Sequence, residues 1–343
     1  MLNVAIIGMG KVGRIRLSCL QAIPGLNVSG FLDVSDVSIS NELGLIKFAT
    51  VGEILADPSI HAVMVATSNE YLATYASMAL RAGKHVFCEK PPGRNLEEFN
   101  KIQEAHKENP TLTLMFGFNH RHKESIRKMF AINDSGQLGD LAWIRCRYGK
   151  ELDEGFFSSW RADPKIAGGG ILLDQGIHGL DLILRLMPKS DETQGIISST
   201  LGLETGLETN AFVQLRDTKS NVGASLHSTA TQWRYTFSLE LSFDRGAIVL
   251  NGLRTPSGRY GDEILTVHRI DDLNHRSSEH FNYQDDDSWL TECLHFVESI
   301  RAGCQPDNGS VEDARKLMLA LEEVYASDKT WTRPALKSPV EDT

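Results

Sequence analysis

The sequence has few cysteines and no long hydrophobic run. Its cysteines are Cys19, Cys88, Cys146, Cys293 and Cys304, an odd number without a Cys-x-x-Cys pair. This spacing excludes a disulfide framework and a zinc ribbon. No apolar stretch approaches the roughly 20 residues that cross a bilayer, and the start of the chain lacks the basic segment of a secretory signal. We therefore expect a cytoplasmic protein without a membrane partner.

Positive charge is also scarce. The 343 residues include 35 Lys and Arg against 45 Asp and Glu, which gives a formal net charge of −10. Because nucleic-acid affinity depends on clustered Lys and Arg, we expect no nucleic-acid partner. An anionic small substrate is not excluded, since Arg121, Arg161 and Lys165 would offer it positive charge locally.

Residues 1–120 alternate apolar runs with helical patterns. The runs lack polar alternation, which is typical of a parallel sheet covered by helices on both faces. We predict an N-terminal Rossmann domain, a doubly wound parallel sheet, over residues 1–120. Its strands are expected at residues 4–7, 27–33, 61–66, 85–88 and 112–116, and its helices at residues 11–22, 70–82 and 96–107.

The pattern changes after residue 120. Alternating segments follow one another between residues 193 and 269, which favours an antiparallel sheet. We predict a second α/β domain over residues 121–343, with a mainly antiparallel sheet and the substrate-binding groups. We expect a strand at residues 141–148, an irregular loop at 150–167, and helices at 123–132, 171–187, 288–300 and 311–326.

A glycine-rich turn stands between the first predicted strand and helix. Gly8-x-Gly10-x-x-Gly13 permits a tight turn, a close approach of the backbone to a pyrophosphate, and close packing of helix on strand. The helix start that carries Lys11 and Val12 would present free N–H groups to the phosphates. A turn without a ligand is the alternative, but the strand before it and the helix after it favour a dinucleotide site.

Asp33 supports the same interpretation. It lies 20 positions after Gly13, at the end of the second predicted strand, where its carboxylate would accept hydrogen bonds from an adenosine ribose. A 2′-phosphate would be repelled, and Val34, Ser35 and Asp36 supply no Arg or Lys to hold one. We therefore expect NAD rather than NADP as the cofactor.

Three further segments resemble one family, the Gfo/Idh/MocA oxidoreductases. Residues 79–91, which read Ala-Leu-Arg-Ala-Gly-Lys-His-Val-Phe-Cys-Glu-Lys-Pro, are similar to the Glu-Lys-Pro signature of the family. Residues 168–178, with three glycines, Asp174 and His178, resemble its second-domain signature. Residues 319–327 resemble its C-terminal helix.

The resemblance implies a large open sheet in the second domain and a homodimer or homotetramer built through that sheet. It also implies a cis peptide bond before Pro91 and cofactor contacts from Thr67, Asn69 and Glu89. One position departs from the family, because Leu72 stands where a His is usual. Any contact made by that His is therefore expected to be missing.

The same signatures carry the candidate catalytic residues. Asp174 and His178 are four positions apart, so they would share one face of a helix. His178 would act as general base in oxidation and as general acid in reduction, with Asp174 tuning and orienting it. Lys90 follows the predicted strand 85–88 at the carboxyl edge of the sheet, where its ammonium would stabilise charge on the reacting oxygen. A helix-surface ion pair and a solvated lysine are the alternatives.

Other polar residues are secondary candidates for the substrate site. Asn119 and Arg121 follow the last predicted strand of the first domain, and Trp160 and Arg161 would stack on a sugar or hold an anionic group. The loop from Trp160 onward also resembles family members encoded with surface-polysaccharide sugar pathways. No third ligand accompanies the two histidines that flank Arg121, so we expect no metal site.

Together these observations predict an NAD(H)-dependent oxidoreductase. It would transfer hydride between the nicotinamide and a secondary alcohol or ketone of a sugar, a sugar derivative such as a nucleotide sugar, or a polyol. Two alternatives stay open at this point. One is a dinucleotide-binding regulator without turnover, and the other is an enzyme that uses the cofactor for elimination, glycoside cleavage or imine reduction.

Overall fold

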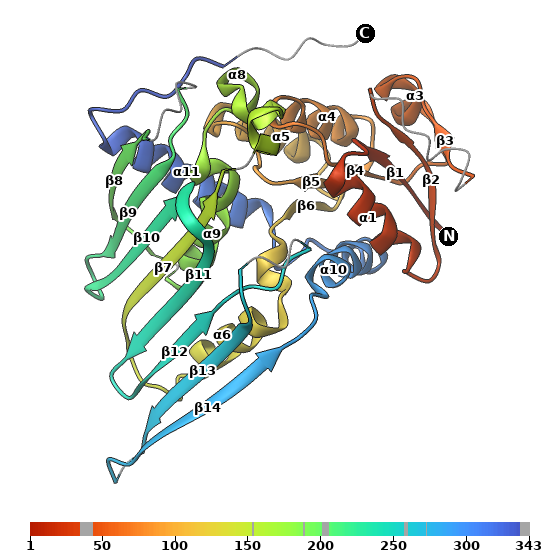
Figure 1. Cartoon of the computed structure of the whole chain (residues 1–343). Coiled ribbons are helices and arrows are strands. Elements are labelled where there is room, and N and C mark those ends of the chain that lie inside the picture. The colour runs from red at the N-terminus through yellow and green to blue at the C-terminus, as the bar shows by residue number, and fades with distance from the viewer. Residues whose placement is uncertain are drawn as a thin grey trace.

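The computed structural model describes residues 1–34, 44–152, 154–187, 189–200, 206–256, 260–271 and 273–336. Two sheets lie side by side, each with helices packed against it (Figure 1). In the first sheet the strand order is β3-β2-β1-β4-β5-β6, and all neighbouring strands are parallel. The strands are β1 (Leu2–Ile7), β2 (Leu26–Leu32), β3 (Ile46–Lys47), β4 (Ala62–Val65), β5 (His85–Glu89) and β6 (Leu114–Gly117).

Helices cover both faces of this sheet, as the unbroken apolar strands predict. The helices α3 (Val51–Ala56), α4 (Asn69–Arg81) and α5 (Leu96–Glu108) join the core on one face. On the other face α1 (Lys11–Gln21) lies beside α10 (Ser288–Ala302), which comes from the far end of the chain. Cys293, Phe296 and Val297 of α10 are fully buried there. Residues 1–120 therefore do not complete the first layer alone, and the boundary near residue 120 stays a prediction.

The second sheet has the strand order β14-β13-β12-β11-β7-β10-β9-β8. Only β7 and β10 run parallel among these neighbours, so the predicted α/β fold with a mainly antiparallel second sheet is confirmed. The strands are β7 (Leu141–Glu151), β8 (Glu192–Ser198), β9 (Asn210–Asp217), β10 (Val222–Thr229), β11 (Thr231–Phe243), β12 (Gly246–Asn251), β13 (Glu263–Ile270) and β14 (Arg276–Tyr283).

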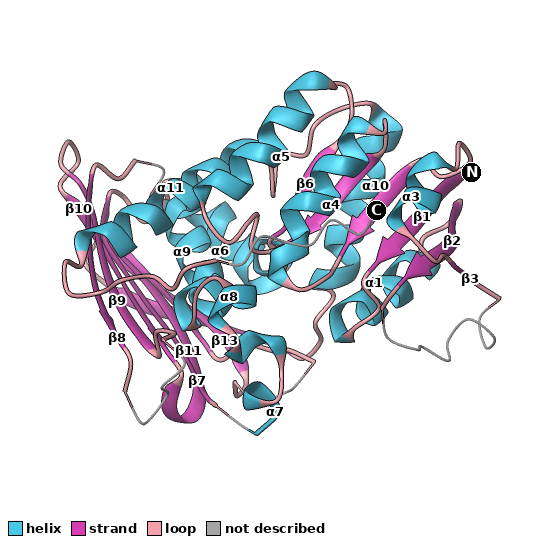
Figure 2. Ribbon diagram, turned by 90° about the horizontal axis from the view of Figure 1, so that it is seen from above, coloured by secondary structure: helices cyan, strands magenta, loops and turns pink. Residues whose placement is uncertain are grey.

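Helices cover one face of the second sheet and leave the other face uncovered (Figure 2). On the uncovered face, Trp143, Ile196 and Phe212 are exposed, and they alternate with buried neighbours on the same strands. No helix in the described ranges is long and apolar enough to span a membrane. The helices of this half are η1 (Asn119–His122), α6 (Glu124–Asp134), α7 (Glu154–Phe157), η2 (Trp160–Ala162), α8 (Pro164–Ala167), η3 (Leu172–Gly176), α9 (Ile177–Leu186) and α11 (Val311–Ser327).

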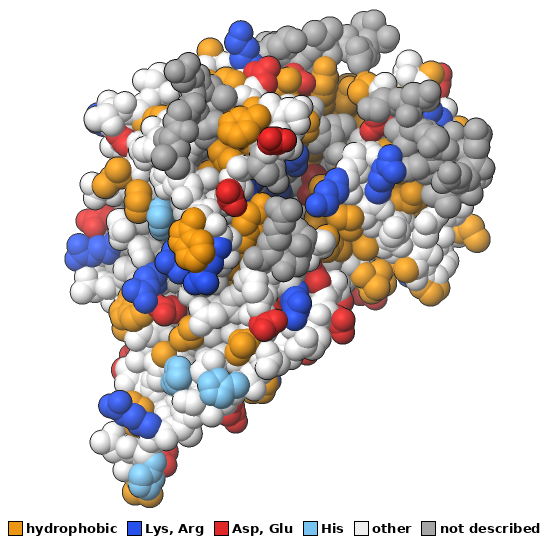
Figure 3. All heavy atoms as spheres, in the orientation of Figure 1, with side chains coloured by type: hydrophobic (Ala, Val, Ile, Leu, Met, Phe, Trp, Pro, Cys, Tyr) orange, Lys and Arg blue, Asp and Glu red, His pale blue; other side chains and the backbone are white. Residues whose placement is uncertain are grey.

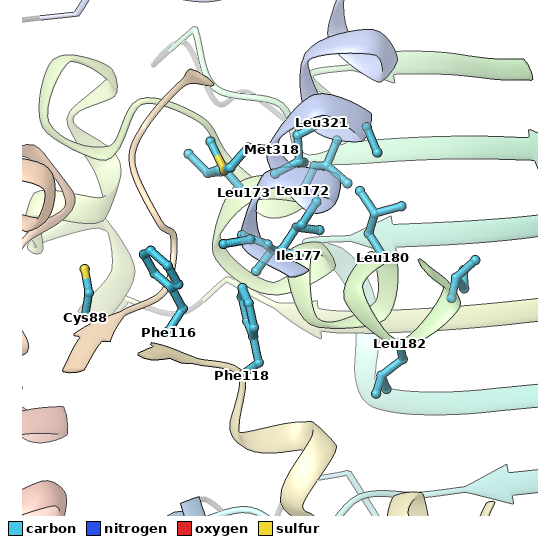
Figure 4. Packing of buried hydrophobic residues seen from close by; sticks show 14 of the residues in the cluster. Cys88, Phe116, Phe118, Leu172, Leu173, Ile177, Leu180, Leu182, Met318 and Leu321 are labelled. Atoms are coloured by element: carbon cyan, nitrogen blue, oxygen red, sulfur yellow. The ribbon is translucent and has the colours of Figure 1, made fainter. Parts of the chain in front are cut away.

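The two halves share one hydrophobic core. Phe116 of β6 and the adjacent Phe118 pack in the same buried cluster as Ile177 of α9 and Met318 of α11 (Figure 4). Two expectations were wrong in detail. The predicted loop 150–167 contains three short helices, and the predicted helix 171–187 begins with a π-helical turn, η3, before α9. A π turn adds a residue to the helical ladder and is often found at functional sites.

Candidate active site

Two connected clefts open at the carboxyl edge of the first sheet. The nucleotide cleft is lined by the glycine turn, Asp33 and the start of α4, and encloses about 1180 Å³ of empty space, part of it open to solvent. The substrate cleft lies towards the second sheet and is lined by His178, Tyr148 and Tyr260 among others. Both clefts are bordered by Lys11, Val12, Glu89, Lys90, Arg161 and Asp174.

The glycine turn has the shape that a dinucleotide requires. Gly8 has a φ of +96°, and a Cβ on it would lie 2.5 Å from the Ala66 oxygen. A Cβ on Gly13 would lie 1.9 Å from the Gly8 oxygen, so Gly13 permits packing of α1 on the turn and does not line the cleft. Gly10 faces open space, with no atom within 4 Å of its would-be Cβ. A phosphate group fits at this point, next to the free N–H groups of the α1 N-terminus.

The other predicted cofactor residues line the same cleft. Asp33 accepts a hydrogen bond of 2.6 Å from the Met9 N–H, which fixes its carboxylate beside the glycine turn. Val34 also lines the cleft, whereas Ser35 and Asp36 lie outside the described residues. Thr67, which precedes α4, and Asn69, the first residue of α4, also line it.

Asn69 also joins the two halves of the chain, because its side-chain amide donates to the Ala167 oxygen at 2.8 Å. Leu72 is fully buried in the hydrophobic core and lines neither cleft. The departure from the family His is therefore accommodated by packing in this chain.

Asp174 and Lys90 meet at the junction of the two clefts. The Lys90–Pro91 peptide bond is cis, as predicted. The Lys90 ammonium donates to the Asp174 backbone oxygen and lies 3.3 Å from Oδ1 of that carboxylate. Lys150, at the end of β7, lies 2.8 Å from Oδ2, and Nε of Arg161 lies 3.4 Å from Oδ1. One carboxylate thus faces three cations.

The surrounding positive charges keep the Asp174 side chain ionised. Burial alone would raise the pKa of Asp174, but Lys150, Lys90 and Arg161 together hold it well below its usual range. Burial lowers the pKa of Lys90, and the attraction of Asp174 opposes that shift. Asp174 is therefore a carboxylate at neutral pH and holds the ammonium of Lys90 at the mouth of the substrate cleft.

The start of the helix that carries Asp174 is held by a buried glutamate. Glu208 accepts hydrogen bonds from the N–H of Gly170 at 2.8 Å and of Leu172 at 3.1 Å. Its carboxylate also accepts from the hydroxyl of Tyr325 at 2.7 Å. A Cβ on Gly170 would lie 2.2 Å from the Glu208 backbone oxygen, so this glycine is required by the close contact.

His178 lies in α9 and stacks on a second histidine. The rings of His178 and His120 are 4.0 Å apart at their centroids and 14° from parallel. His120 is fixed by Asn119 Oδ1, 3.1 Å from Nδ1, and by the Tyr148 hydroxyl, 3.0 Å from Nε2. Burial lowers the pKa of both imidazoles well below the usual range, and Lys90 adds to this effect. Both rings are therefore neutral near pH 7, and each has one ring nitrogen without a proton.

No hydrogen bond joins Asp174 to His178 within the described chain, although Asp174 was expected to tune and orient His178. Nδ1 of His178 is buried and has no hydrogen-bond partner among the described residues. The carboxylate raises the pKa of His178 only through space, against the larger effects of burial and Lys90. Asp174 lies in the π turn and His178 lies in α9, so the two residues do not have the spacing of one regular α-helix.

Glu89 is held by a buried ion-pair network that the sequence did not reveal. Arg16 of α1 is completely buried and lies 2.6 Å from Oε1 of Glu89. The same guanidinium pairs with Glu292 of α10 and packs against the rings of Phe87 and Trp289, each 4.5 Å from its centroid. A single charge within the apolar face of the predicted helix 11–22 was the signal that could have identified Arg16.

Arg121 does not line either cleft, although it was a candidate for the substrate. It is 4% exposed, and its guanidinium contacts both oxygens of Asp181 at 2.7 Å and Asp313 at 3.0 Å. It therefore joins η1 to α9 and α11. Asn119 and Arg161 do line the substrate cleft, and Trp160 lines the nucleotide cleft with the Arg161 guanidinium 4.4 Å from its ring centroid.

Sequence reasoning missed several residues of the substrate cleft. They come from η1, β7, η3 and the segment before β13, which meet only in the folded chain, and among them only Gln175 lies within a motif, the signature 168–178. Within the described ranges, no group of three or more His, Cys, Asp or Glu is arranged to hold a metal ion. The missed residues are Lys150, His120, Tyr148, Gln175 and Tyr260.

A glycine turn at the end of β1, a buried lysine and a neutral histidine together define a Rossmann-fold oxidoreductase. The chain belongs to the Gfo/Idh/MocA oxidoreductase family. Residues 2–118 match the family model described as an oxidoreductase family with an NAD-binding Rossmann fold, and residues 126–249 match the C-terminal domain model of the same family.

Named relatives cover most of the chain. It is 25% identical to a myo-inositol 2-dehydrogenase of Thermotoga maritima over 345 residues, which cover 96% of each chain. It is 32% identical to a levoglucosan dehydrogenase of Pseudarthrobacter phenanthrenivorans over 213 residues, 58% of this chain and 54% of the relative. A levoglucosan dehydrogenase structure, in complex with NADH and levoglucosan, has the same fold, with a TM-score of 0.84, 21% identity, and coverage of 96% of this chain and 97% of the other.

The buried glutamate beneath the nucleotide cleft gives a testable pH dependence of stability. Burial raises the pKa of Glu292 to about 8 from an ordinary value of 4.5, although Arg16 opposes the shift. Between these two values the folded state holds a proton that the unfolded state has lost. The stabilisation from this group is therefore fully present below pH 4.5 and declines as the pH rises towards 8.

We expect Glu292→Gln to remove this decline. The thermal unfolding midpoint of the wild type, relative to that of the variant, should fall between about pH 5 and about pH 8 in scanning calorimetry. Glu298→Gln changes an exposed glutamate on the same helix and should follow the wild type. Parallel curves for the wild type and Glu292→Gln would contradict the assignment.

Proposed function

We propose that the protein transfers hydride between NAD and a secondary alcohol or ketone of a sugar, a sugar derivative or a polyol. The observation that carries this proposal is the position of Lys90 and His178 in the substrate cleft, where Lys90 also borders the nucleotide cleft that the glycine turn lines. The relatives named myo-inositol 2-dehydrogenase and levoglucosan dehydrogenase support the same class of substrate.

The side chains divide the reaction between them. The nicotinamide of bound NAD supplies the hydride acceptor. In oxidation the neutral imidazole of His178 takes the hydroxyl proton, and in reduction it returns that proton to the oxygen. The Lys90 ammonium donates a hydrogen bond to the same oxygen and stabilises its developing negative charge. Asp174 keeps Lys90 charged and positioned, because it pairs with the ammonium through both its backbone and its carboxylate.

The two groups give a first prediction for turnover. His178→Ala and Lys90→Ala should each lower kcat by about 10²-fold or more, since a positioned proton-transfer group contributes roughly 10²–10⁴-fold. NADH affinity of the His178 variant, measured by fluorescence titration, should stay close to that of the wild type. The assay is the absorbance of NADH with a panel of sugars, nucleotide sugars and polyols.

Lys101→Ala serves as the matched control, because Lys101 is exposed on α5 and lines neither cleft. It should leave turnover unchanged. Near-normal rates in both cleft variants would rule out the proposed roles.

The cofactor preference rests on Asp33. We propose that its carboxylate binds the adenosine ribose and repels the 2′-phosphate of NADP. NADH should therefore bind at least about tenfold more tightly than NADPH. Asp33→Asn should narrow this difference, because an amide oxygen still accepts the hydrogen bond from Met9 while the charge is gone. Fluorescence titrations with both nucleotides measure the ratio, and tighter binding of NADPH by the wild type would refute the role.

We also propose that the protein is a homodimer or homotetramer assembled through the uncovered face of the second sheet. Hydrophobic side chains and Lys or Arg side chains lie together on the face shown in Figure 3. Trp143 and Phe212 are each 42% exposed and Ile196 is 60% exposed on this sheet. Exposed apolar patches of this kind mark interaction surfaces.

Negative charges introduced on this face should dissociate the assembly. Trp143→Glu combined with Phe212→Glu should shift the mass measured by light scattering after size exclusion to that of one chain. Leu273→Glu, which alters a residue 76% exposed in the turn before β14, is the control and should keep the wild-type mass. A monomeric wild type, or an unchanged mass in the double variant, would count against this interface.

A cytoplasmic location is part of the same proposal. All five cysteines are free thiols. Free thiols fit a reducing compartment, in which structural disulfides rarely persist. The odd number and wide spacing of these cysteines in the sequence support the same conclusion.

A further inference from the structure

The substrate cleft carries more positive charge than its own carboxylates neutralise. The cations Lys90, Lys150 and Arg161 surround the single carboxylate of Asp174. This leaves two positive charges in surplus at the centre of a protein whose net charge is −10. A low-dielectric cleft of one sign concentrates ligands of the opposite sign.

The other carboxylates of the cleft are already paired with their own cations. The negative charge of Glu89 is neutralised by the ion pair with Arg16. Asp286 lies 3.0 Å from the ammonium of Lys123, which also lies 3.6 Å from Glu263. Neither carboxylate contacts Lys150 or Arg161 within the described chain. Asp174 is therefore the only carboxylate in the described chain that Lys150 and Arg161 contact, and an anion that enters the cleft would balance the surplus charge.

Lys150 and Arg161 are placed to meet a substrate. Lys150 borders the substrate cleft with His178 but does not border the nucleotide cleft. Its side chain is 19% exposed and that of Arg161 is 38% exposed, so both reach solvent in the cleft. Arg161 touches Asp174 only through Nε, at 3.4 Å, and its remaining N–H groups have no acceptor among the described residues.

The arrangement of Arg161 is also fixed in advance. Its guanidinium stacks against Trp160, and Ser159 caps the short helix that carries both residues. An arginine held in this way presents paired N–H donors to a planar carboxylate or to a phosphate. Lys150, at the end of β7, adds a point charge from the second sheet.

We propose that Lys150 and Arg161 form an anion-binding subsite, and that the substrate is a sugar derivative with a carboxylate or phosphate group close to the reacting carbon. This assignment rests on the proposed dehydrogenase function and specifies the substrate class. The anionic group occupies the donors of Arg161 and Lys150, while Lys90 and His178 meet the hydroxyl that reacts.

The test is calorimetric binding to the NADH-saturated protein, so that it does not depend on turnover. The probes are matched by structure: D-glucose, D-glucuronate for the carboxylate and D-glucose 6-phosphate for the phosphate. At least one anionic probe should bind at least about tenfold more tightly than glucose, because charge-assisted hydrogen bonds are stronger than hydrogen bonds between neutral groups. The advantage should shrink as salt is raised. The better of the two anions identifies the group.

Variants assign the preference to the subsite. Lys150→Gln and Arg161→Gln should each abolish most of the advantage of the anionic probe, whereas Lys150→Arg should keep it. Lys165→Gln removes the same charge from an exposed residue of α8 that borders neither cleft, and should match the wild type. NADH titrations of all four variants establish that the nucleotide cleft is intact.

The proposal is overturned if neither anion binds better than glucose, including the case in which no probe binds. It is also overturned if Lys150→Gln and Arg161→Gln keep the preference. Failure of the dehydrogenase function would appear separately, as the absence of NADH production or consumption with every alcohol and ketone despite normal binding of NADH and of the anion.

Discussion

The contact between Lys90 and Asp174 is the constraint on which the site depends. Lys90 comes from the edge of the parallel sheet, and Asp174 comes from the π turn that begins the helix packed on the second sheet. Their pairing joins the cleft for the nucleotide to the cleft for the substrate. The glycines upstream of Asp174 and the buried Glu208 serve this contact, because they hold the turn at the position where its carbonyl and carboxylate reach the ammonium.

A second buried charge network supports the same edge from below. Arg16, Glu89 and Glu292 come from α1, β5 and α10, so the last third of the chain completes the first layer. Burying the Arg16 charge and its two carboxyl partners costs free energy, and removal of one partner is more costly than replacing the whole group. The network therefore fixes the relative positions of these elements more than it adds stability. That role explains why a buried arginine lies directly beneath the nucleotide cleft.

The sequence predicted local features well and distant pairings poorly. Gly8, Gly10 and Asp33 follow a motif with fixed spacing, and the alternation of strands and helices was sufficient to predict the parallel sheet. Lys150 belongs to no motif, since its role exists only because the end of β7 lies beside the π turn. For Arg121 the sequence predicted a role that the fold does not support. Its place after β6 indicated a contact with the substrate, but two aspartates from α9 and α11 pair with it in the fold. Charge pairing between elements far apart in sequence decides such cases.

Two of the lysines that line the substrate cleft act on the proton-transfer group. After burial, the field of Lys90 and Lys123 lowers the pKa of His178, and Asp174 opposes this only through space. A base with so low a pKa accepts a proton weakly, and general-base catalysis is most effective when the pKa is close to the working pH. An anion bound beside Lys150 and Arg161 would offset the positive field and raise the pKa of His178 towards neutrality. An anionic substrate would thus strengthen the base that acts on it, whereas a neutral sugar in the same cleft would leave the base weak.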